Sequence, residues 1–346
     1  MISVYDVLYK VIDFVSRSMP YQLFQGQTLP SRRDIERSIR RMFEEHFTKP
    51  TQLQISDVQT LGRGVHRIAY EVNISLRPDE FNLAGRYVLL YPYEEEAAGL
   101  QTRLLREIDA LVALTQSTPL FRYPQIIGNS IMDDAIVILE KKVEGVPIDL
   151  RAGRCMVGQP WDVAGEIAAR VHELNDVALA LDGYATRRAH AIESIKSLDG
   201  HEHSIFKEAK AWCMEHLPPP NVPSTLLHGD LSGQNILVDI AGKQAPALID
   251  WTFTLRGDPA HELAIITQGK RRPFEVDDGH ERLLNAYVDA GGPELSVNDI
   301  YLYEFCLFGR RYTAATTRGR QRIESPQEPL RLLHNLLVRL TKKSHP

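Results

Sequence analysis

The stretch STLLHGDLSGQNILVDI, residues 224–240, places a short polar turn between two apolar runs. This alternation predicts a strand, a loop and a second strand. Asp230 and Asn235 then lie at the two ends of the loop, where the strands hold a carboxylate and an amide in place. A later apolar run, residues 247–249, ends at Asp250 and predicts another short strand, which brings a second carboxylate beside the loop.

Three converging side chains with oxygen atoms indicate phosphoryl-transfer chemistry. Hard divalent cations such as Mg²⁺ bind oxygen ligands, commonly one or two carboxylates together with phosphates and water. A carboxylate that does not bind the metal can accept a proton from a substrate hydroxyl. The alternative interpretation is a pair of Asx-capped turns between strands, which occur in any fold.

The composition is that of an ordinary folded globular chain. Of its 346 residues, 43% are hydrophobic and 25% are charged, so the chain is neither disordered nor fibrous. The length is sufficient for one large domain or for two smaller lobes. The net charge of −5 lacks the basic excess of nucleic-acid-binding proteins, and we therefore expect no nucleic-acid partner.

Cysteine usage and hydropathy favour a cytoplasmic protein without a membrane partner. The three cysteines are far apart and form no C-x-x-C pair, which argues against a disulfide framework or a zinc site. Charged residues at positions 6, 10 and 13 interrupt the apolar start of the chain before a signal-peptide core could form. No run of 18 apolar residues occurs elsewhere.

Periodicity divides the chain into three parts. Residues 1–50 predict a helical N-terminal extension, which could cap the next lobe or form a dimer contact; the oligomeric state stays open. Residues 51–143 predict a small nucleotide-binding lobe in the order three strands, a helix and two strands. Residues 144–346 predict a helical catalytic and substrate-binding lobe, with late helices near 258–268, 278–290, 298–316 and 326–342.

The motifs resemble those of the aminoglycoside phosphotransferase and choline kinase family, relatives of the eukaryotic protein kinases. H-G-D-x-x-x-x-N, I-D-W and G-D-P-x-x-[DE]-L-A occur here in the family's order and close to its usual spacing. The resemblance covers roughly residues 55–290. It implies an α+β, protein-kinase-like bilobal fold with a five-stranded antiparallel N-lobe and a mostly helical C-lobe.

The resemblance also implies a role for each matched side chain. The reaction would use ATP, preferred over GTP, together with Mg²⁺. By resemblance, Asp230 is the catalytic base, and Asn235 and Asp250 hold Mg²⁺. His228 would hold the loop in place. Asp258 and Glu262 look like the acidic pair that supports the loop and borders the substrate site.

The nucleotide-binding residues rest on the same resemblance. The turn LGRGVHRIAY, with Gly62 and Gly64, resembles a phosphate cradle, although a plain hairpin bend is the alternative. Glu107 falls where the family carries a helix glutamate that pairs with a strand lysine; the alternative is a solvent-facing helix residue. The nucleotide is expected near Glu140 and Val143.

One position departs from the family pattern. Leu90 occupies the place where relatives carry a third-strand lysine, or sometimes an arginine, that binds the ATP phosphates. Arg86 lies roughly 13 Å away at about 3.3 Å per residue, which is too far for a replacement. Arg67, beside the glycine turn, is the favoured substitute. Loss of such a cation without a substitute could cost roughly 3–4 kcal/mol of transition-state stabilisation.

Together these features predict a kinase that transfers the ATP γ-phosphate to a hydroxyl of a small molecule. An antibiotic of the aminoglycoside, hygromycin or macrolide type is the first candidate acceptor. The alternatives are a metabolic kinase of a sugar, choline or homoserine, and a kinase-fold nucleotide-binding protein without phosphotransfer activity. Two basic segments, GKRRP at 269–273 and GRRYTAATTRGRQR at 309–322, are either solvated faces or a site for an anionic substrate or partner.

Overall fold

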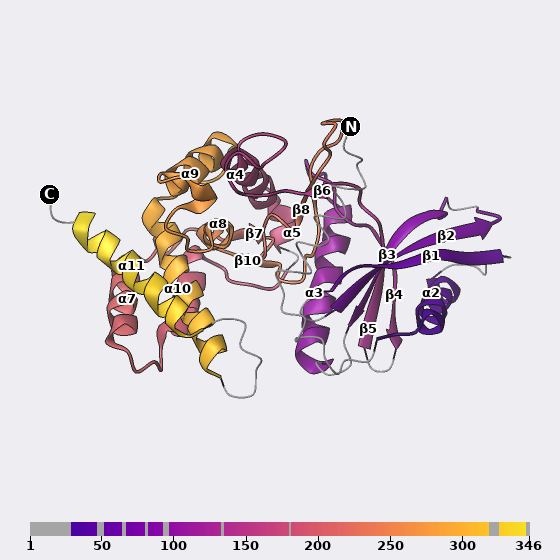
Figure 1. Ribbon diagram of the computed structural model, residues 1–346, viewed down its shortest axis with the longest axis horizontal. Helices are drawn as coiled ribbons and strands as arrows, with labels where there is room; N and C mark the ends of the chain where they lie inside the picture. The colour runs from indigo at the N-terminus through magenta and orange to yellow at the C-terminus, as the bar shows by residue number, and fades with distance from the viewer. Residues whose placement is uncertain are drawn as a thin grey trace. The chain divides into compact units, whose positions relative to one another are not determined.

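The computed structural model describes residues 29–46, 52–63, 67–79, 82–92, 97–132, 135–179, 181–317 and 325–343. Much of the predicted N-terminal extension, residues 1–28 and 47–50, therefore lies outside the described residues. The chain forms two compact units (Figure 1). The first unit consists of Met1–Thr115 and Tyr123–Glu144, and the second of Gln116–Arg122 and Gly145–Pro346.

An antiparallel sheet in the order β1-β2-β3-β5-β4 forms the centre of the first unit. Its strands are β1 (Gln52–Arg63), β2 (Arg67–Arg77), β3 (Gly85–Pro92), β4 (Ile126–Met132) and β5 (Ala135–Lys141). Buried and less buried residues alternate along much of β2, because successive side chains of a strand point to opposite faces. The predicted five-stranded antiparallel sheet is confirmed.

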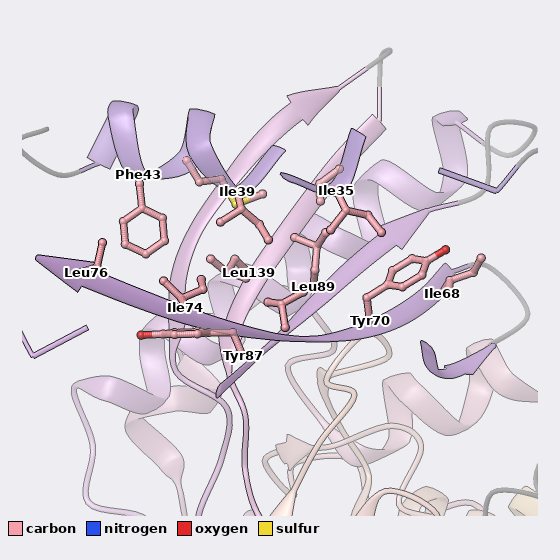
Figure 2. Packing of buried hydrophobic residues seen from close by; sticks show 13 residues of the cluster. Ile35, Ile39, Phe43, Ile68, Tyr70, Ile74, Leu76, Tyr87, Leu89 and Leu139 are labelled. Atoms are coloured by element: carbon pink, nitrogen blue, oxygen red, sulfur yellow. The ribbon is translucent and has the colours of Figure 1, made fainter. Parts of the chain in front are cut away.

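Helix α2 (Arg32–His46) covers one face of this sheet (Figure 2). Its apolar residues recur at helical spacing and so form a single stripe. The stripe and the sheet face below it make one buried cluster. The cluster includes Ile35, Ile39, Met42 and Phe43 from α2, and Ile68, Tyr70, Val72, Ile74, Leu76, Tyr87, Leu89, Val137 and Leu139 from the strands.

Helix α3 (Ala97–Thr115) packs on the opposite face. Leu104 of α3 is buried against Leu90, Ile136 and Ile138, which belong to strands β3 and β5. The sheet is thus covered by α2 on one side and by α3 on the other (Figure 1).

The second unit is mostly helical. Its long helix α10 (Val297–Thr316) begins at Ser296, whose side chain and Asp299 form a capping box. The late helices predicted from the sequence begin and end within one residue of those observed. Among the described helices, none combines the length and the apolar character that crossing a membrane requires. The other helices of the unit are α4 (Pro160–His172), α5 (Asn175–Leu179), α6 (Arg187–Ile195), η2 (Lys196–Leu198), α7 (Ser204–Glu215), α8 (Pro259–Thr267), η3 (Pro273–Glu275), α9 (Gly279–Asp289) and α11 (Gln327–Lys343).

Short strands interrupt the helices in the part of the sequence that contains Asp230, Asn235 and Asp250. Strand β8 pairs with both β6 and β9, and β7 pairs with β10, all antiparallel. The strands are β6 (Val146–Pro147), β7 (Thr225–Leu227), β8 (Ile236–Val238), β9 (Ala247–Leu248) and β10 (Leu255–Gly257). The loop from β7 to β8 and the end of β9 therefore lie close together.

Candidate active site

The loop between β7 and β8 holds Asp230 and Asn235 against each other. The Asn235 Nδ2 group donates to the backbone oxygen of Asp230 at 2.8 Å and to its Oδ2 at 3.0 Å. Gly229 begins the turn at φ +82°, and a Cβ there would lie 2.0 Å from the backbone oxygen of Phe253. Only glycine fits at this position, because the backbone is left-handed and the neighbouring chain leaves no space.

Asp250 reaches the same place through the pairing of β8 with β9. The Ile249 N–H donates to the backbone oxygen of Asn235 at 3.1 Å, which fixes the residue before Asp250 beside the loop. Asp250 itself has φ +65°, an uncommon conformation for a residue other than glycine. Its Oδ1 accepts a hydrogen bond of 2.6 Å from the Thr252 hydroxyl. The structure thus brings together the three side chains that the sequence singled out.

Asp230 is held in an environment that favours its protonated form. Burial raises the pKa of Asp230 to about 6, the negative charge of Asp250 adds to this rise, and the hydrogen bond from Asn235 opposes it. A carboxyl group with a pKa nearer to neutrality is a stronger base than an ordinary aspartate. The environment is thus suited to accepting a proton from an alcohol.

His228 connects the loop that bears Asp230 to the chain just before Asp250. Its Nε2 lies 3.0 Å from the backbone oxygen of Ile249, and since a carbonyl only accepts, Nε2 carries the hydrogen. Its Nδ1 then accepts the N–H of Asp230 at 3.4 Å. Burial lowers the pKa of His228 to about 4, against the opposing charge of Asp250 and the bond to Ile249, so the ring is neutral near pH 7. The side chain is 0% exposed and acts on the loop rather than on a substrate.

Glu262 of α8 supports the loop from beneath. Its carboxyl group accepts the backbone N–H groups of His228 at 2.6 Å, Gly229 at 3.2 Å and Leu231 at 3.3 Å. Burial raises the pKa of Glu262 to about 7, although these three hydrogen bonds lower it. One fully buried side chain therefore fixes three backbone donors of the loop that bears Asp230.

We expect the raised pKa of Glu262 to make stability depend on pH. The folded pKa of about 7 lies above the ordinary value of 4.5, so the folded chain binds more protons than the unfolded chain between these values. The stability from this group is therefore fully present below pH 4.5 and is lost as the pH rises through 7. Between pH 5 and pH 7 the loss is about 2 kcal/mol.

Urea unfolding of the wild type and of Glu262→Gln at pH 5 and pH 7 measures this effect. The stability of the wild type relative to the variant should fall as the pH rises, because glutamine does not titrate. An equal difference at both pH values would show that the pKa of Glu262 is not raised.

Asp258 lies one turn before Glu262 but does not touch the loop. It forms the N-cap of α8, where its Oδ1 accepts the Ala260 N–H at 3.1 Å. The same oxygen accepts a hydrogen bond from Arg187 Nε at 2.9 Å. Burial raises the pKa of Asp258 to about 6, and the Arg187 charge opposes the rise. Asp258 and Glu262 are both 0% exposed. Among the hydrogen bonds of the described residues, those between this acidic pair and the loop involve Glu262, and those of the Asp258 carboxyl group involve Ala260 and Arg187.

Asn235 and Asp250 provide two oxygen ligands suited to Mg²⁺. The Asn235 amide nitrogen is directed at Asp230, which leaves its oxygen for a cation, and the Asp250 carboxylate provides charge. Within the described ranges, no group of three or more His, Cys, Asp or Glu side chains could hold a metal ion by itself. An ion bound here would need further ligands from a phosphate or from water, which is the usual pattern for Mg²⁺.

In the first unit, Arg67 pairs with the helix glutamate. The guanidinium Nη2 of Arg67 lies 3.1 Å from Glu107 Oε1, and Nη1 contacts the other carboxylate oxygen. Glu107 is 1% exposed, so it does not face solvent. Arg67 lies opposite Pro92 in the register of β2 and β3, and Ala69 lies opposite Leu90. Residues two apart share a face, so Arg67 and Leu90 are on the same side of the sheet.

The other residues expected around the nucleotide have less distinctive surroundings. Gly62 lies near the end of β1, where a Cβ would have no atom of the described residues within 4 Å, and Gly64 lies outside the described residues. Glu140 is buried in β5, and Val143 is half-buried after it. Arg86 forms an ion pair of 2.8 Å with Glu144.

A buried ion pair on the sheet was not predicted. Lys142 Nζ lies 2.8 Å from Glu71 Oε1, and both side chains are largely buried. Glu71 lies opposite Val88 of β3, and Val88 lies opposite Glu140 of β5. Val88 and Leu90 are two residues apart on β3, so Glu71 lies on the same face of the sheet as Leu90. The signal was a carboxylate within the short run IAYEV, residues 68–72, whose other side chains are apolar or aromatic, which indicates a buried partner.

A known protein family matches the part of the chain that contains this site. The family model described as the phosphotransferase enzyme family matches residues 85–299, which is more than half of the chain. The chain belongs to this family. The match spans the loop with Asp230, the end of β9 and helix α8.

Solved structures of phosphotransferases have the same fold. Macrolide 2′-phosphotransferase MphH from Brachybacterium faecium has a TM-score of 0.57 and 18% identity, over 87% of this chain and 98% of that chain. Aminoglycoside phosphotransferase APH(4)-Ia has a TM-score of 0.57 and 13% identity, over 82% of this chain and 93% of that chain. The predicted protein-kinase-like α+β fold of the phosphotransferase is therefore confirmed.

Curated relatives match a smaller part of the chain. Acyl-CoA dehydrogenase family member 11 from Gallus gallus is 26% identical over 113 residues, which are 31% of this chain and 14% of that protein. The human protein of the same name is 26% identical over 106 residues, again 14% of its length. The phosphotransferase thus spans about a seventh of the curated relatives that it matches.

Proposed function

We propose that this phosphotransferase transfers the γ-phosphate of ATP to a hydroxyl group of a small molecule, with Asp230 as the base. The observation that carries the proposal is the cluster of Asp230, Asn235 and Asp250 in the second unit. The hydrogen bond of 3.0 Å from Asn235 orients the Asp230 carboxyl group, the one of 2.8 Å holds the Asp230 backbone oxygen, and the β8–β9 pairing holds Asp250 beside them.

In this reaction the acceptor oxygen forms a bond to the γ-phosphorus while the bond from that phosphorus to the ADP oxygen breaks. The hydroxyl proton moves to the Asp230 carboxylate. Glu262 accepts the N–H groups of the residues on both sides of Asp230, and His228 accepts the N–H of Asp230 itself. Mg²⁺ held by Asn235 and Asp250 would supply charge neutralisation at the phosphate oxygens.

Arg67 is the proposed replacement for the missing strand lysine. It carries the positive charge on the same sheet face as Leu90 and pairs with Glu107, the glutamate that the lysine of relatives would contact. The guanidinium group has further donors beyond those directed at Glu107. Arg67 would thus contribute a positive charge toward the nucleotide phosphates from β2.

ATP as the donor draws support from a structural neighbour. A thermostable mutant of APH(4)-Ia has been crystallised as a ternary complex with AMP-PNP and hygromycin B, and it has a TM-score of 0.57 and 13% identity to this chain. An antibiotic acceptor remains a prediction of the sequence resemblance. Two alternative functions also stay predictions, namely a kinase of a sugar, choline or homoserine and a fold that binds nucleotide without transferring phosphate. The cytoplasmic location stays a prediction as well.

Titration with ATP and Mg²⁺, followed by thermal unfolding, tests the nucleotide and metal roles. Ligand at one hundred times its dissociation constant should stabilise the wild type by about 2.7 kcal/mol. Asp250→Asn should lose most of this shift, because asparagine tolerates the left-handed backbone but has no charge for the metal. Stabilisation of both proteins to the same extent would contradict the assignment of Asp250.

The same titration examines Arg67. Arg67→Gln should bind Mg–ATP more weakly than the wild type. It should also unfold at a lower temperature without ligand, because Glu107 loses a buried partner. Equal affinity of the two proteins for Mg–ATP would show that Arg67 does not contribute to nucleotide binding. No shift for the wild type would favour a fold that no longer binds nucleotide.

A further inference from the structure

A large cavity lies within the second unit and reaches the catalytic loop. Gly229, Asp230 and Ser232 line it at the loop, and helices α8, α10 and α11 provide most of its remaining wall. Figure 1 shows α11 beside α10, in agreement with their packing. The volume of about 1340 Å³ exceeds the 300–1,000 Å³ of common ligand pockets. The cavity therefore has room for an acceptor whose hydroxyl reaches Asp230.

The charged residues of this cavity are mostly basic. They come from three places that are far apart in the sequence, namely the turn after α8, the last two turns of α10, and α11. The two basic segments noted in the sequence thus contribute to one cavity, although positions 318, 320 and 322 of the second segment lie outside the described residues. The basic lining residues are Lys270, Arg271, Arg310, Arg311, Arg331 and Arg339.

The acidic lining residues do not balance this charge. Besides Asp230, the lining contains two carboxylates, Glu304 and Glu328. Glu328 is paired with Arg331, whose Nε and Nη2 donate at 2.8 and 2.6 Å. Glu304 is 1% exposed; its Oε1 accepts the Thr267 hydroxyl at 2.6 Å and lies 2.8 Å from His280 Nε2. Neither carboxylate is therefore placed to attract a cationic ligand.

Several of the basic groups have no acidic partner. In the part of the chain that the structure describes, Lys270, Arg271 and Arg310 form no ion pair with a carboxylate. The Arg310 Nη2 lies 3.2 Å from His261 Nε2. Burial lowers the pKa of His261 well below its ordinary value, so the ring is a neutral acceptor that orients Arg310 without cancelling its charge.

Apolar side chains complete the wall. Ile265, Leu307, Leu332 and Leu336 belong to α8, α10 and α11 and line the same cavity, together with Phe253 of the loop that follows Asp250. A cavity with an apolar wall and a surplus of cations is complementary to a molecule with an apolar body and a negative group. A polycationic acceptor would be repelled by the same charges.

We infer that the acceptor of this enzyme is an anionic alcohol, a molecule with an apolar body, a hydroxyl group and a carboxylate or phosphate. This inference rests on the proposed function, because it names the substrate class of the site that contains Asp230. Lys270, Arg271 and Arg310 bind the negative group, and the apolar wall holds the body so that the hydroxyl lies at Asp230. An aminoglycoside does not meet these requirements.

A series of acceptors that differ only in the head group tests the inference. The series consists of hydroxydecanoate, hydroxydecyl phosphate, decanediol and aminodecanol, each with a terminal hydroxyl on the same ten-carbon chain. Phosphate transfer from ATP is measured as kcat/KM for each compound. At least one of the two anions should exceed the diol about tenfold or more, the amine should fall below the diol, and the better anion identifies the preferred head group.

Charge variants connect the preference to the cavity. Arg310→Gln and Lys270→Gln should each lower the ratio of kcat/KM for the preferred anion to that for decanediol by about fivefold or more. Because both kcat/KM values are measured on the same variant, a general loss of activity or of folded protein cancels in their ratio. The matched control is Arg272→Gln, since Arg272 follows Arg271, pairs with Asp277 at 2.9 Å and does not line the cavity. Its ratio should stay at the wild-type value.

Three outcomes would overturn the inference. Preference for the diol or the amine would do so and leave the proposed phosphotransfer intact. An unchanged ratio in both charge variants would show that these cations do not select the acceptor. Transfer to none of the four compounds would also reject this substrate class, and the Mg–ATP titration then decides separately whether the proposed function fails as well.

Discussion

Asp230→Asn is expected to lower kcat for phosphate transfer by roughly 10²–10⁴-fold, the usual contribution of a positioned general base. Asparagine has nearly the same size and can still contact Asn235, but its amide does not accept the proton of the acceptor. The Mg–ATP shift in unfolding temperature should be largely retained, because Asn235 and Asp250 are unchanged.

The measurement is initial-rate kinetics with saturating ATP and the best acceptor of the head-group series. Asp239→Asn is a suitable control, since Asp239 lies in the turn between β8 and β9, where it accepts backbone N–H groups of Ala241 and Lys243. Its rate should equal that of the wild type. Full activity in Asp230→Asn would show that another group accepts the proton.

Glu262→Ala is expected to reduce the free energy of unfolding by roughly 3–5 kcal/mol. The change leaves the buried N–H groups of His228, Gly229 and Leu231 without an acceptor, and each unsatisfied buried group costs about 1–3 kcal/mol. We expect kcat to fall in the variant as well, because the loop that bears Asp230 loses its support.

Urea unfolding measures this loss. Glu262→Gln should be less destabilised than Glu262→Ala, since its amide oxygen can accept some of the same N–H groups. Glu215→Ala, at the exposed end of α7, should change the free energy by less than about 0.5 kcal/mol. A loss below about 1 kcal/mol in Glu262→Ala would mean that water or a neighbouring group replaces the carboxylate.

The cluster around Asp230 could be located from the sequence because its arrangement is local. Asp230 and Asn235 are five residues apart, and a loop between two short strands is sufficient to bring them into contact. The long helices could also be placed, because many apolar residues at helical spacing give a strong signal. Strands β6 and β10 were not predicted, since β6 contains a proline and β10 ends in a glycine, and both residues are typical of turns.

The remaining features depend on contacts between distant segments. The Arg67–Glu107 pair requires both the register of β2 with β3 and the rotation of α3, and neither follows from spacing alone. The sequence indicated that Asp258 and Glu262 act together, but only their positions show that Glu262 binds the loop and Asp258 caps α8 with Arg187. The basic cavity likewise requires the packing of α8, α10 and α11.

The coverage of the sheet by α2 has a consequence for how the protein can be shortened. The family match begins at residue 85, which is the first residue of β3. A chain trimmed to that match would lack α2, β1 and β2, and β3 would become an edge strand. The side chains of Tyr87, Leu89 and Leu139 would face water, and such open apolar edges promote aggregation. The unit that folds on its own is therefore larger than the segment that the family model matches.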